Sequence, residues 1–258
     1  MPVTHPPLRF ARLQPAPAIV LEQVSLSFGP VSIFENLSLT FPAGKTTCIL
    51  GPSGCGKSSL LKIIAGIQPF DSGRCATGKG HSLTGQVAWM GQKDLLLEWL
   101  PLVDNLLLGA RLRGESIQEK QPRALELLAA AGLADSAHEL PSRLSGGMRQ
   151  RGALLRTLME DRPVLLMDEP FSALDALTRM RLQNLAAQLT EGATVVLVTH
   201  DPLEALRLGH DIIVLTEKPA TKAIHQCPSG NPPRNPGDHN LAEQHAALLA
   251  LLMNGEGP

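Results

Sequence analysis

The 258-residue sequence contains no tyrosine, and aromatic residues account for only 3% of its positions. No apolar run approaches the ~18 residues that a helix needs to cross a bilayer; the longest candidate is 246–253. Residues 1–17 are rich in proline and lack the apolar core of a secretory signal. The sequence therefore predicts a soluble chain, for which any role at a membrane requires a partner.

The chain also lacks an excess of charge of either sign. Its net charge is −1, which argues against nucleic acid as the main partner. Apolar residues make up 43% and charged residues 18%, a globular composition. The four cysteines show no paired metal-ligand spacing, and a chain of this length needs no disulfide framework, so a reducing compartment is expected. They are Cys48, Cys55, Cys75 and Cys227.

A glycine-rich loop at 51–58 matches the phosphate-loop pattern G-x-x-x-x-G-K-[ST]. It follows an apolar strand expected at 47–50 and precedes a helix expected at 58–65, which is the context that the motif requires. Backbone amides would surround the phosphates, Lys57 would reach the β- and γ-phosphates, and Ser58 would bind Mg²⁺. The candidate nucleotide ligands are Gly51, Pro52, Ser53, Gly54, Cys55, Gly56, Lys57, Ser58 and Ser59.

Asp168 and Glu169 end a second apolar run, 164–167. Taken alone, an acidic pair after a strand is usually a helix N-terminus or a solvated turn. A phosphate loop in the same chain favours another interpretation, in which Asp168 holds Mg²⁺ and Glu169 polarises the attacking water.

Two further apolar runs, 195–199 and 212–215, alternate with helical segments. This order predicts a parallel sheet covered on both faces, with ligands at the carboxyl ends of its strands. Gly51, Asp168 and His200 each follow such a strand.

The other segments predict two additions to this sheet and a tail. Alternating apolar residues at 19–41 predict antiparallel strands, and Leu- and Ala-rich residues from 95 to about 162 predict helices. Ser116 with Glu119 forms a capping box, but Pro122 fits poorly inside a helix, so the helix start is expected nearer Gln121. Residues 217–240 are expected to be a loose extension, and 241–253 a short helix.

The segment 144–151, Leu-Ser-Gly-Gly-Met-Arg-Gln-Arg, is the most specific stretch. An ordinary helix start explains a capping Ser145, but not two successive glycines that disfavour a helix. In the order 51–58, Gln92, 144–151, 164–169 and His200, these motifs resemble the ATP-binding subunit of an ABC transporter.

The resemblance covers about residues 19–216 and implies an α/β fold. This fold is a P-loop NTPase (RecA-like) core with a mainly parallel sheet, an N-terminal antiparallel β subdomain and an inserted α-helical subdomain at about 95–162. Residues 1–18 would then be a flexible arm, and 217–258 a variable C-terminal extension.

The family also implies roles for single residues. Ser145, Gly146 and Gly147 would clamp the γ-phosphate of ATP held by the second copy of a head-to-tail homodimer. Gln92 would touch Mg²⁺ or water, alongside Ser58 and Asp168, and His200 would contact the γ-phosphate. The expected catalytic set is Lys57, Gln92, Glu169 and His200, with ATP and Mg²⁺ bound. The plainer alternatives are a solvated Gln92 and a structural His200.

Phe28 matches the aromatic that stacks on adenine, a position where relatives often carry the tyrosine that this chain lacks. Packing in the core is the alternative. Cys55, beside Lys57 and a helix N-terminus, is expected to be a reactive thiol that ATP protects; a thiol packed away and inert is the alternative.

Segments 92–101 and 168–179 look like those of importers of the nitrate, sulfonate and taurine type. That group includes importers of pyrimidine precursors of thiamine, toward which residues 90–115 lean. The implied partners are integral-membrane permease subunits and, indirectly, a solute-binding protein, at the cytoplasmic face of the inner membrane. The triplet 209–211, Gly-His-Asp, departs from the usual Ala-Asp-Arg. Trp99, in the apolar run 95–102, is expected either to fill the helical core or to line a groove for a permease helix.

Two other functions were weighed. A soluble ABC-type ATPase acting on nucleic acid or ribosomes usually has coiled-coil insertions or two cassettes, whereas this chain has one cassette, no heptad insertion and no basic stripe. A nucleotide-binding regulator without turnover does not account for Glu169 and His200 both being present.

Overall fold

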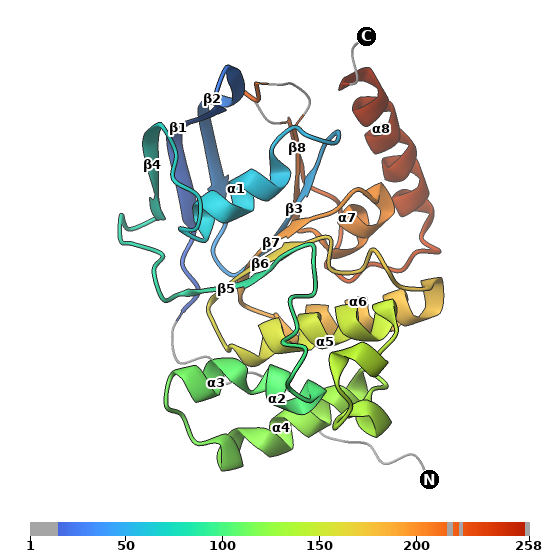
Figure 1. The fold of residues 1–258 in the computed structure, drawn as a ribbon. Coiled ribbons are helices and arrows are strands. Elements are labelled where there is room, and N and C mark those ends of the chain that lie inside the picture. Colours follow the sequence, from blue (N-terminus) through green and yellow to red (C-terminus); the bar gives the residue numbers. More distant parts are fainter. Residues whose placement is uncertain (1–14, 216–218, 222–223, 256–258) are drawn as a thin grey trace.

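The computed structural model describes residues 15–215, 219–221 and 224–255. Its centre is a six-stranded sheet in the order β5-β6-β7-β3-β8-β9 (Figure 1). All neighbouring strands are parallel except β8 and β9. The strands are β3 (Thr46–Leu50), β5 (Val87–Met90), β6 (Val164–Asp168), β7 (Thr194–Val198), β8 (Asp211–Val214) and β9 (Ile224–Gln226).

The sheet is apolar on both faces because helices and a second sheet cover it. In β6, Val164 and Leu166 face one hydrophobic cluster, while Leu165 and Met167 face the other. β7 alternates in the same way. Continuous apolar strands therefore predicted the doubly covered parallel sheet correctly.

The second sheet is antiparallel, three-stranded and ordered β2-β1-β4. It packs with helix α1 on the first face of the central sheet, in the cluster that contains Phe34 and Phe41. Its strands are β1 (Ile19–Phe28), β2 (Val31–Phe41) and β4 (Ser72–Thr77), and α1 spans Lys57–Ile64. The antiparallel pair expected at 19–41 is confirmed.

The other helices belong to the second face. The cluster on that face contains residues of α2, α4, α5, α6, α7 and α8. In Figure 1, α2 to α4 lie beyond α5, away from the sheet. The bounds are α2 (Leu102–Leu106), α3 (Leu108–Leu112), α4 (Ile117–Ala130), α5 (Gly146–Met159), α6 (Ala176–Leu189), α7 (Pro202–Leu208) and α8 (His239–Gly255), with 3₁₀ turns at Ala134–Ser136 and Pro141–Arg143.

Helix α4 corrects one prediction. It begins at Ile117, with the Ser116 hydroxyl accepting a hydrogen bond from the Glu119 amide at 3.4 Å, and Pro122 lies inside it. The start near Gln121 was therefore wrong. The ring of Pro122 removes one backbone hydrogen bond near the helix start, but the cap and the buried Ala124, Leu127 and Leu128 hold the helix.

The C-terminal tail corrects a second prediction. Residues 224–226 form β9 on β8, and Arg234 is buried against the end of α7, so the region is not the loose extension expected. Helix α8 begins before residue 241 and buries Leu241 and Leu248 in the core. Of the expected arm, residues 1–14 lie outside the described residues, while the Pro17 carbonyl accepts a hydrogen bond from Thr194.

Within the described parts of the chain, none of the helices has both the length and the apolar character needed to cross a bilayer.

Candidate nucleotide site

Four loops meet at the carboxyl edge of the central sheet. They follow β3, β5, β6 and β7, which run parallel side by side. A cavity of about 290 Å³ opens there. Its lining is Ile33, Ser53, Gly54, Gly56, Lys57, Ser58, Ser59, Gln92, Asp168, Glu169 and Val198. The structure thus brings predicted residues from three separate motifs into one cavity.

The phosphate loop is shaped by close backbone approaches. A Cβ at Gly56 would lie 2.5 Å from Cγ2 of Ile33 and 2.7 Å from Cζ of Phe34. At Gly51 a Cβ would lie 2.5 Å from the Leu215 carbonyl oxygen. Both glycines have positive φ, at +101° and +153°, and only glycine meets both demands without displacing the fold. The loop then delivers the N-terminus of α1, where unpaired amides favour anions.

Lys57 is the cation of this cavity. Its ammonium donates hydrogen bonds to the carbonyl oxygens of Gly51 and Pro52, each at 2.7 Å. The side chain is thus folded over the loop that it follows. An ammonium held there lies where a polyphosphate would be bound by the loop amides.

Asp168 ends β6 and is only 5% exposed. Burial raises the pKa of its carboxyl above the usual value, and the negative Glu169 adds to that, while a hydrogen bond with the Ser58 hydroxyl and the charge of Lys57 oppose the shift. Asp168 and Ser58 both line the cavity, and a carboxylate and a hydroxyl are oxygen donors of the kind that Mg²⁺ takes.

Glu169 has a backbone φ of +50°, which is unusual for a residue with a side chain. Its amide donates to the Val198 carbonyl at 2.9 Å. Its carboxylate Oε2 lies 3.3 Å from Nδ1 of His200. Backbone strain of this kind is concentrated at functional sites, and here it accompanies a carboxylate that lines the cavity and contacts the imidazole of His200, which is not itself part of the lining.

One residue of this region had no role in the sequence analysis. Gln150, buried in α5, donates from Nε2 to the Glu169 carbonyl at 2.9 Å and to the Ser172 hydroxyl at 3.0 Å. Its Oε1 accepts the Ala173 amide at 2.7 Å. All three bonds join residues at least 19 apart in sequence, so no local pattern could have indicated them.

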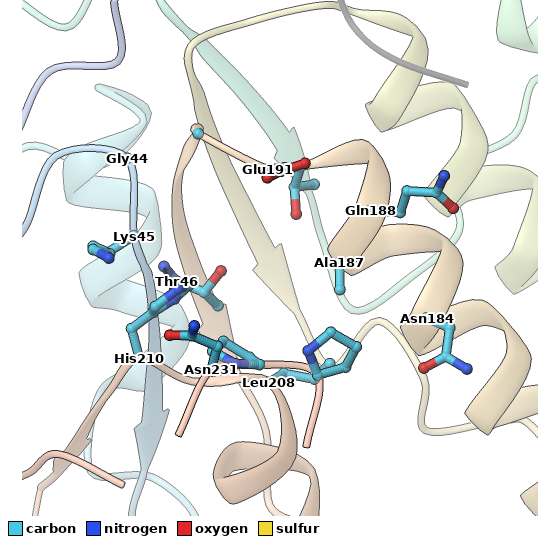
Figure 2. Close-up of a pocket in the computed structure, with 14 residues that line it drawn as sticks. Gly44, Lys45, Thr46, Asn184, Ala187, Gln188, Glu191, Leu208, His210 and Asn231 are labelled. Carbon is cyan, nitrogen blue, oxygen red and sulfur yellow. Dashed lines mark hydrogen bonds between the residues drawn. The ribbon is translucent and has the colours of Figure 1, made fainter. Parts of the chain in front are cut away.

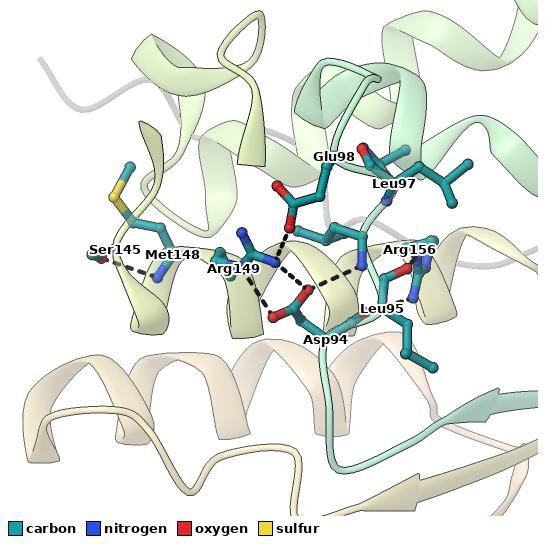
Figure 3. Close-up of polar contacts among 10 residues, drawn as sticks. Asp94, Leu95, Leu97, Glu98, Ser145, Met148, Arg149 and Arg156 are labelled. Carbon is teal, nitrogen blue, oxygen red and sulfur yellow. Dashed lines mark hydrogen bonds and ion pairs between the residues drawn. The ribbon is translucent and has the colours of Figure 1, made fainter. Parts of the chain in front are cut away.

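Ser145, Gly146 and Gly147 do not line this cavity. They form the start of α5, with the Ser145 hydroxyl accepting the Met148 amide at 3.3 Å, and Ser145 and Gly146 are exposed (Figure 3). Gly146 instead lines a neighbouring cavity of about 450 Å³ together with Gln92 and Ala173. Within one copy, then, this segment does not reach the phosphate loop.

The burial of Phe28 and Cys55 decides between the alternatives that the sequence left open for each residue. Phe28, at the end of β1, is 49% exposed, so the alternative of core packing is wrong. Cys55 is 1% exposed and belongs to the hydrophobic cluster around Phe34. Its Sγ lies 4.0 Å from the Lys57 ammonium, but the burial of this side chain makes the expectation of a reactive thiol wrong in this structure.

A third cavity, of about 500 Å³, lies at the opposite edge of the sheet (Figure 2). It is lined by residues that precede β3, β7 and β8, by the end of α6, and by 231–233 of the tail. Motifs that bind phosphate do not converge there, since Gly51, Gln92, Asp168 and His200 all lie beyond the other strand ends. The cavity of about 290 Å³ beside the phosphate loop is therefore the candidate site.

Known proteins resemble the chain in a way that fits this geometry. A family model described as "ABC transporter" matches residues 34–172, more than half of the chain. The chain belongs to the ABC transporter family. The predicted family and fold class are thereby confirmed.

Curated relatives of this ABC chain carry names of ATP-binding subunits. An uncharacterized ABC transporter ATP-binding protein of Haemophilus influenzae is 43% identical over 90% of this chain and 97% of its own length. The aliphatic sulfonates import ATP-binding protein SsuB 2 of Burkholderia cenocepacia is 40% identical over 86% and 82%. The taurine import ATP-binding protein TauB of Pseudomonas aeruginosa is 43% identical over 78% and 80%.

A solved structure adds the ligand state. The dimeric ATP-binding cassette MJ0796, in a post-hydrolysis state bound to ADP and Pi, superposes with a TM-score of 0.74. It is 30% identical and covers 83% of this chain and all of its own. This ABC chain is accordingly an ATP-binding subunit with ATPase activity.

Proposed function

We propose that this ABC chain is the ATP-hydrolysing subunit of an importer, and that it works as a head-to-tail homodimer on a separate permease. The observation that carries the proposal is the split of the motifs. Residues of the phosphate loop, Asp168 and Glu169 share one cavity, whereas Ser145 to Gly147 lie outside its lining, at a helix start where Ser145 and Gly146 are exposed. A second copy facing head to tail would place that start over the nucleotide.

In this proposal each residue has one role at the bound nucleotide. Lys57 and the amides of residues 51–59 bind the phosphates. Glu169 accepts the proton of the attacking water. His200, in contact with Glu169, reaches toward the γ-phosphate, and Phe28 offers an exposed ring to adenine. Ser145, Gly146 and Gly147 of the other copy close the site.

The residues present also fit Mg²⁺. Ser58 and Asp168 supply hydroxyl and carboxylate oxygens, and Gln92 lines the same cavity with an amide oxygen; such hard oxygen donors suit this ion. When bound, Mg²⁺ would neutralise phosphate charge. In the same proposal residues 19–216 form the ATPase domain, with its helical subdomain at about 95–162.

For the solute we propose a small molecule with a sulfonate group, such as an aliphatic sulfonate or taurine. This rests on the import proteins named above and on the segments 92–101 and 168–179. A pyrimidine precursor of thiamine is the second candidate. The proposed location is the cytoplasmic face of the inner membrane, reached through the permease and served indirectly by a solute-binding protein.

The permease contact is proposed at the loop that carries Trp99. The Trp99 side chain is 72% exposed and Leu95 is 55% exposed, so the alternative that Trp99 fills the core is wrong. The loop itself is held firmly. Buried Asn105 accepts the Leu97 amide at 2.7 Å and donates to the Leu100 carbonyl at 2.9 Å. An exposed aromatic on a fixed loop suits a helix-in-groove contact.

Substituting Glu169→Gln tests the proposed function. The amide keeps the shape but cannot take a proton, so turnover should fall by about 10²–10⁴-fold while ATP still binds. With ATP the variant should accumulate as a closed dimer, measured by light scattering. Wild-type turnover in this variant, or a monomer at saturating ATP, would contradict the proposal.

Trp99→Ala tests the partner. The variant should fold and hydrolyse ATP normally in isolation, yet fail to copurify with the membrane permease and lose stimulation of its ATPase by solute. Asn105→Ala is the comparison, since it should release the loop and also lower stability. Copurification of the wild-type chain with nucleic acid or ribosomes in place of a membrane protein would favour the rival ABC-type ATPase.

A further inference from the structure

Helix α5 grips the residues that follow Gln92. Arg149 donates from Nε to Oδ2 of Asp94 at 3.0 Å and from Nη2 to Oδ1 of Asp94 at 3.1 Å (Figure 3). The same Nη2 donates to Oε1 of Glu98 at 2.5 Å. The pairing with Asp94 is bidentate, a geometry that fixes direction as well as distance. We call residues 92–98 the Gln92 segment.

A second arginine holds the backbone of that segment. Arg156, about two turns further along α5, donates to the carbonyl oxygens of Asp94 at 2.7 Å and Leu95 at 2.6 Å. Leu95 has a φ of +49°, so the chain turns sharply at this point. Side chain and backbone of the Gln92 segment are therefore both attached to one helix.

The pair of Arg149 and Asp94 is not an ordinary surface ion pair. Their side chains are 24% and 25% exposed. Burial tends to raise the pKa of Asp94, but hydrogen bonds from Arg149 and the Leu96 amide, with the charges of Arg149 and Arg156, hold it below the usual value. The carboxylate is thus charged and satisfied in the fold.

The same helix turn touches the other two functional segments. The Arg149 amide donates to the Ser145 carbonyl at 2.9 Å, so Arg149 lies one turn from the exposed start of α5. Its neighbour Gln150 bonds Glu169, Ser172 and Ala173. One turn of α5 therefore joins the Gln92 segment, the segment after β6 and Ser145 to Gly147.

We propose that Arg149 is a positioning residue that makes the Gln92 segment and the start of α5 move as one body. In the homodimer of the proposed function, on which this inference rests, Gln92 senses the nucleotide of its own copy. Ser145 to Gly147 act on the nucleotide of the other copy. Arg149 then couples the two nucleotide sites, because a shift at Gln92 is passed by rigid contacts to the residues that close the opposite site.

The contacts make a specific demand on the side chain. Lysine keeps the charge at position 149 but offers a single ammonium, which cannot hold both oxygens of Asp94 and also Glu98 in a fixed direction. If direction matters, Arg149→Lys will resemble Arg149→Ala. If only charge matters, it will resemble wild type.

The experiment compares Arg149→Ala, Arg149→Lys and the double variant Asp94→Asn/Glu98→Gln with wild type. Arg143→Ala is the matched control, since Arg143 makes an exposed ion pair with Glu139 at 3.1 Å. For each we would measure kcat, KM and the Hill coefficient for ATP, the affinity of the monomer for a fluorescent ATP analogue, and Tm. In the Glu169→Gln background, dimer formation with ATP is measured by light scattering.

We expect Arg149→Ala and the double variant to lower kcat by about 5-fold or more, the lower range of a typical coupling between sites. The Hill coefficient should fall to about 1, and dimers should form only at higher ATP, while analogue affinity stays within about 2-fold of wild type. Arg149→Lys should restore less than half of kcat. Arg143→Ala should match wild type.

Wild-type kcat, cooperativity and dimer formation in both Arg149→Ala and the double variant would overturn the inference. So would a kinetic loss that appears only alongside an equal loss of analogue affinity, which would mark a damaged nucleotide site. If Arg149→Ala fails to fold, the double variant, which keeps size and removes charge, decides alone. Failure of the wild-type chain to hydrolyse ATP or to dimerise with it would instead refute the proposed function.

Discussion

The two edges of the central sheet carry similar kinds of polar residue, but the surroundings of those residues differ. At the carboxyl edge Lys57 and Glu169 line an open cavity, on a backbone that adopts positive φ at Glu169, and His200 contacts Glu169 from outside the lining. At the amino edge, where the cavity of about 500 Å³ lies, the polar groups of Thr194 and His210 are hydrogen-bonded within the fold. The Thr194 hydroxyl donates to the Pro17 carbonyl at 2.7 Å and accepts the Gly44 amide at 3.0 Å.

His210 shows the same contrast with His200. Nδ1 of His210 accepts the Thr46 amide at 3.1 Å, and its own amide donates to the Thr46 carbonyl at 2.7 Å. Burial, with the charges of Lys45 and Arg234, lowers the pKa of this imidazole. The unusual triplet 209–211 thus extends the pairing at the start of β3, whereas His200 is 66% exposed and touches a catalytic candidate.

The difference separates stability from function along single strands. A polar group satisfied within the fold contributes to stability and has little left to offer a ligand. A polar group that faces a cavity on strained backbone lowers stability and remains available for chemistry. Substitutions at the carboxyl edge should therefore change nucleotide handling, and those at the amino edge should change unfolding.

Two lysines at opposite ends of β3 give the largest expected effect. Lys57→Ala removes an ammonium from the phosphate loop, and ATP binding should weaken by about 100-fold, or about 3 kcal/mol. Lys45→Ala removes an exposed ammonium at the other end and should change ATP affinity by less than about 2-fold. Isothermal titration with ATP measures both. Equal losses in the two variants would break the proposed division between the edges.

Arg234 should show the largest effect on stability. Its guanidinium donates to five carbonyl oxygens, including those of Leu206 and Gly209 at the end of α7, at 2.6 and 2.7 Å. Arg234→Ala leaves these acceptors unpaired in a buried place and should cost about 2–3 kcal/mol, lowering Tm by about 6 °C. Thermal unfolding followed by circular dichroism measures the shift.

The control for Arg234 is Arg74→Ala. Arg74 is more than half exposed and bonds only the Gly80 carbonyl and Glu22 among described residues, so its loss should stay within about 0.5 kcal/mol. ATP affinity should be retained in both variants. A melting temperature unchanged in Arg234→Ala would mean that the tail does not hold α7.

The tail and the phosphate loop show what the sequence could and could not predict. The loop at 51–58 and the runs at 164–167 and 195–199 were readable because their signals are local: a glycine spacing, or a continuous apolar strand. β4 was missed because Ser72–Thr77 has no apolar run and half of it is exposed; it exists by pairing with β1, some fifty residues earlier. The clamp of Arg234 is equally non-local.

The candidate site likewise had features that the sequence predicted and features that it did not. Its residue types followed from motifs, while side-chain directions did not. Cys55 lies between loop residues that face the cavity, yet it points into the core because Ile33 and Phe34 pack under that turn. Gln150 and Arg149 were part of a recognised segment, but their partners Glu169 and Asp94 are 19 and 55 residues away. Only the packing of α5 against the sheet reveals them.

Glu204 extends the comparison to pH. It is buried in α7, four residues after His200; burial, then the nearby Asp201, raises its pKa to about 7, although hydrogen bonds from Thr199 and Gln183 oppose this. A raised folded-state pKa means that the proton stabilises the fold. That contribution is complete below the unfolded pKa of about 4.5 and is lost as pH rises through about 7.

Glu204→Gln, which mimics the protonated acid, should therefore stabilise the chain at pH 8 by roughly 2 kcal/mol and have little effect near pH 5. Urea unfolding at the two pH values measures the difference. A variant that is less stable than wild type at both pH values would show that the charged carboxylate, with Arg179 nearby, is the favoured form.

The smallest effect is expected at Phe28, where relatives often carry tyrosine and a Phe28→Tyr variant can be made. The ring is half-exposed at the end of β1, on the antiparallel sheet, and contributes no charge. Phe28→Ala should weaken ATP binding by about 5-fold, or about 1 kcal/mol, because a stacked adenine loses its partner. Phe28→Tyr keeps the ring and should stay within about 2-fold.

The measurement for Phe28 compares the affinity for ATP with the affinity for a triphosphate that lacks a base. Loss of the ring should weaken only the first, since phosphate binding belongs to Lys57 and the loop; if both weaken equally, Phe28 supports the phosphate loop and does not contact adenine.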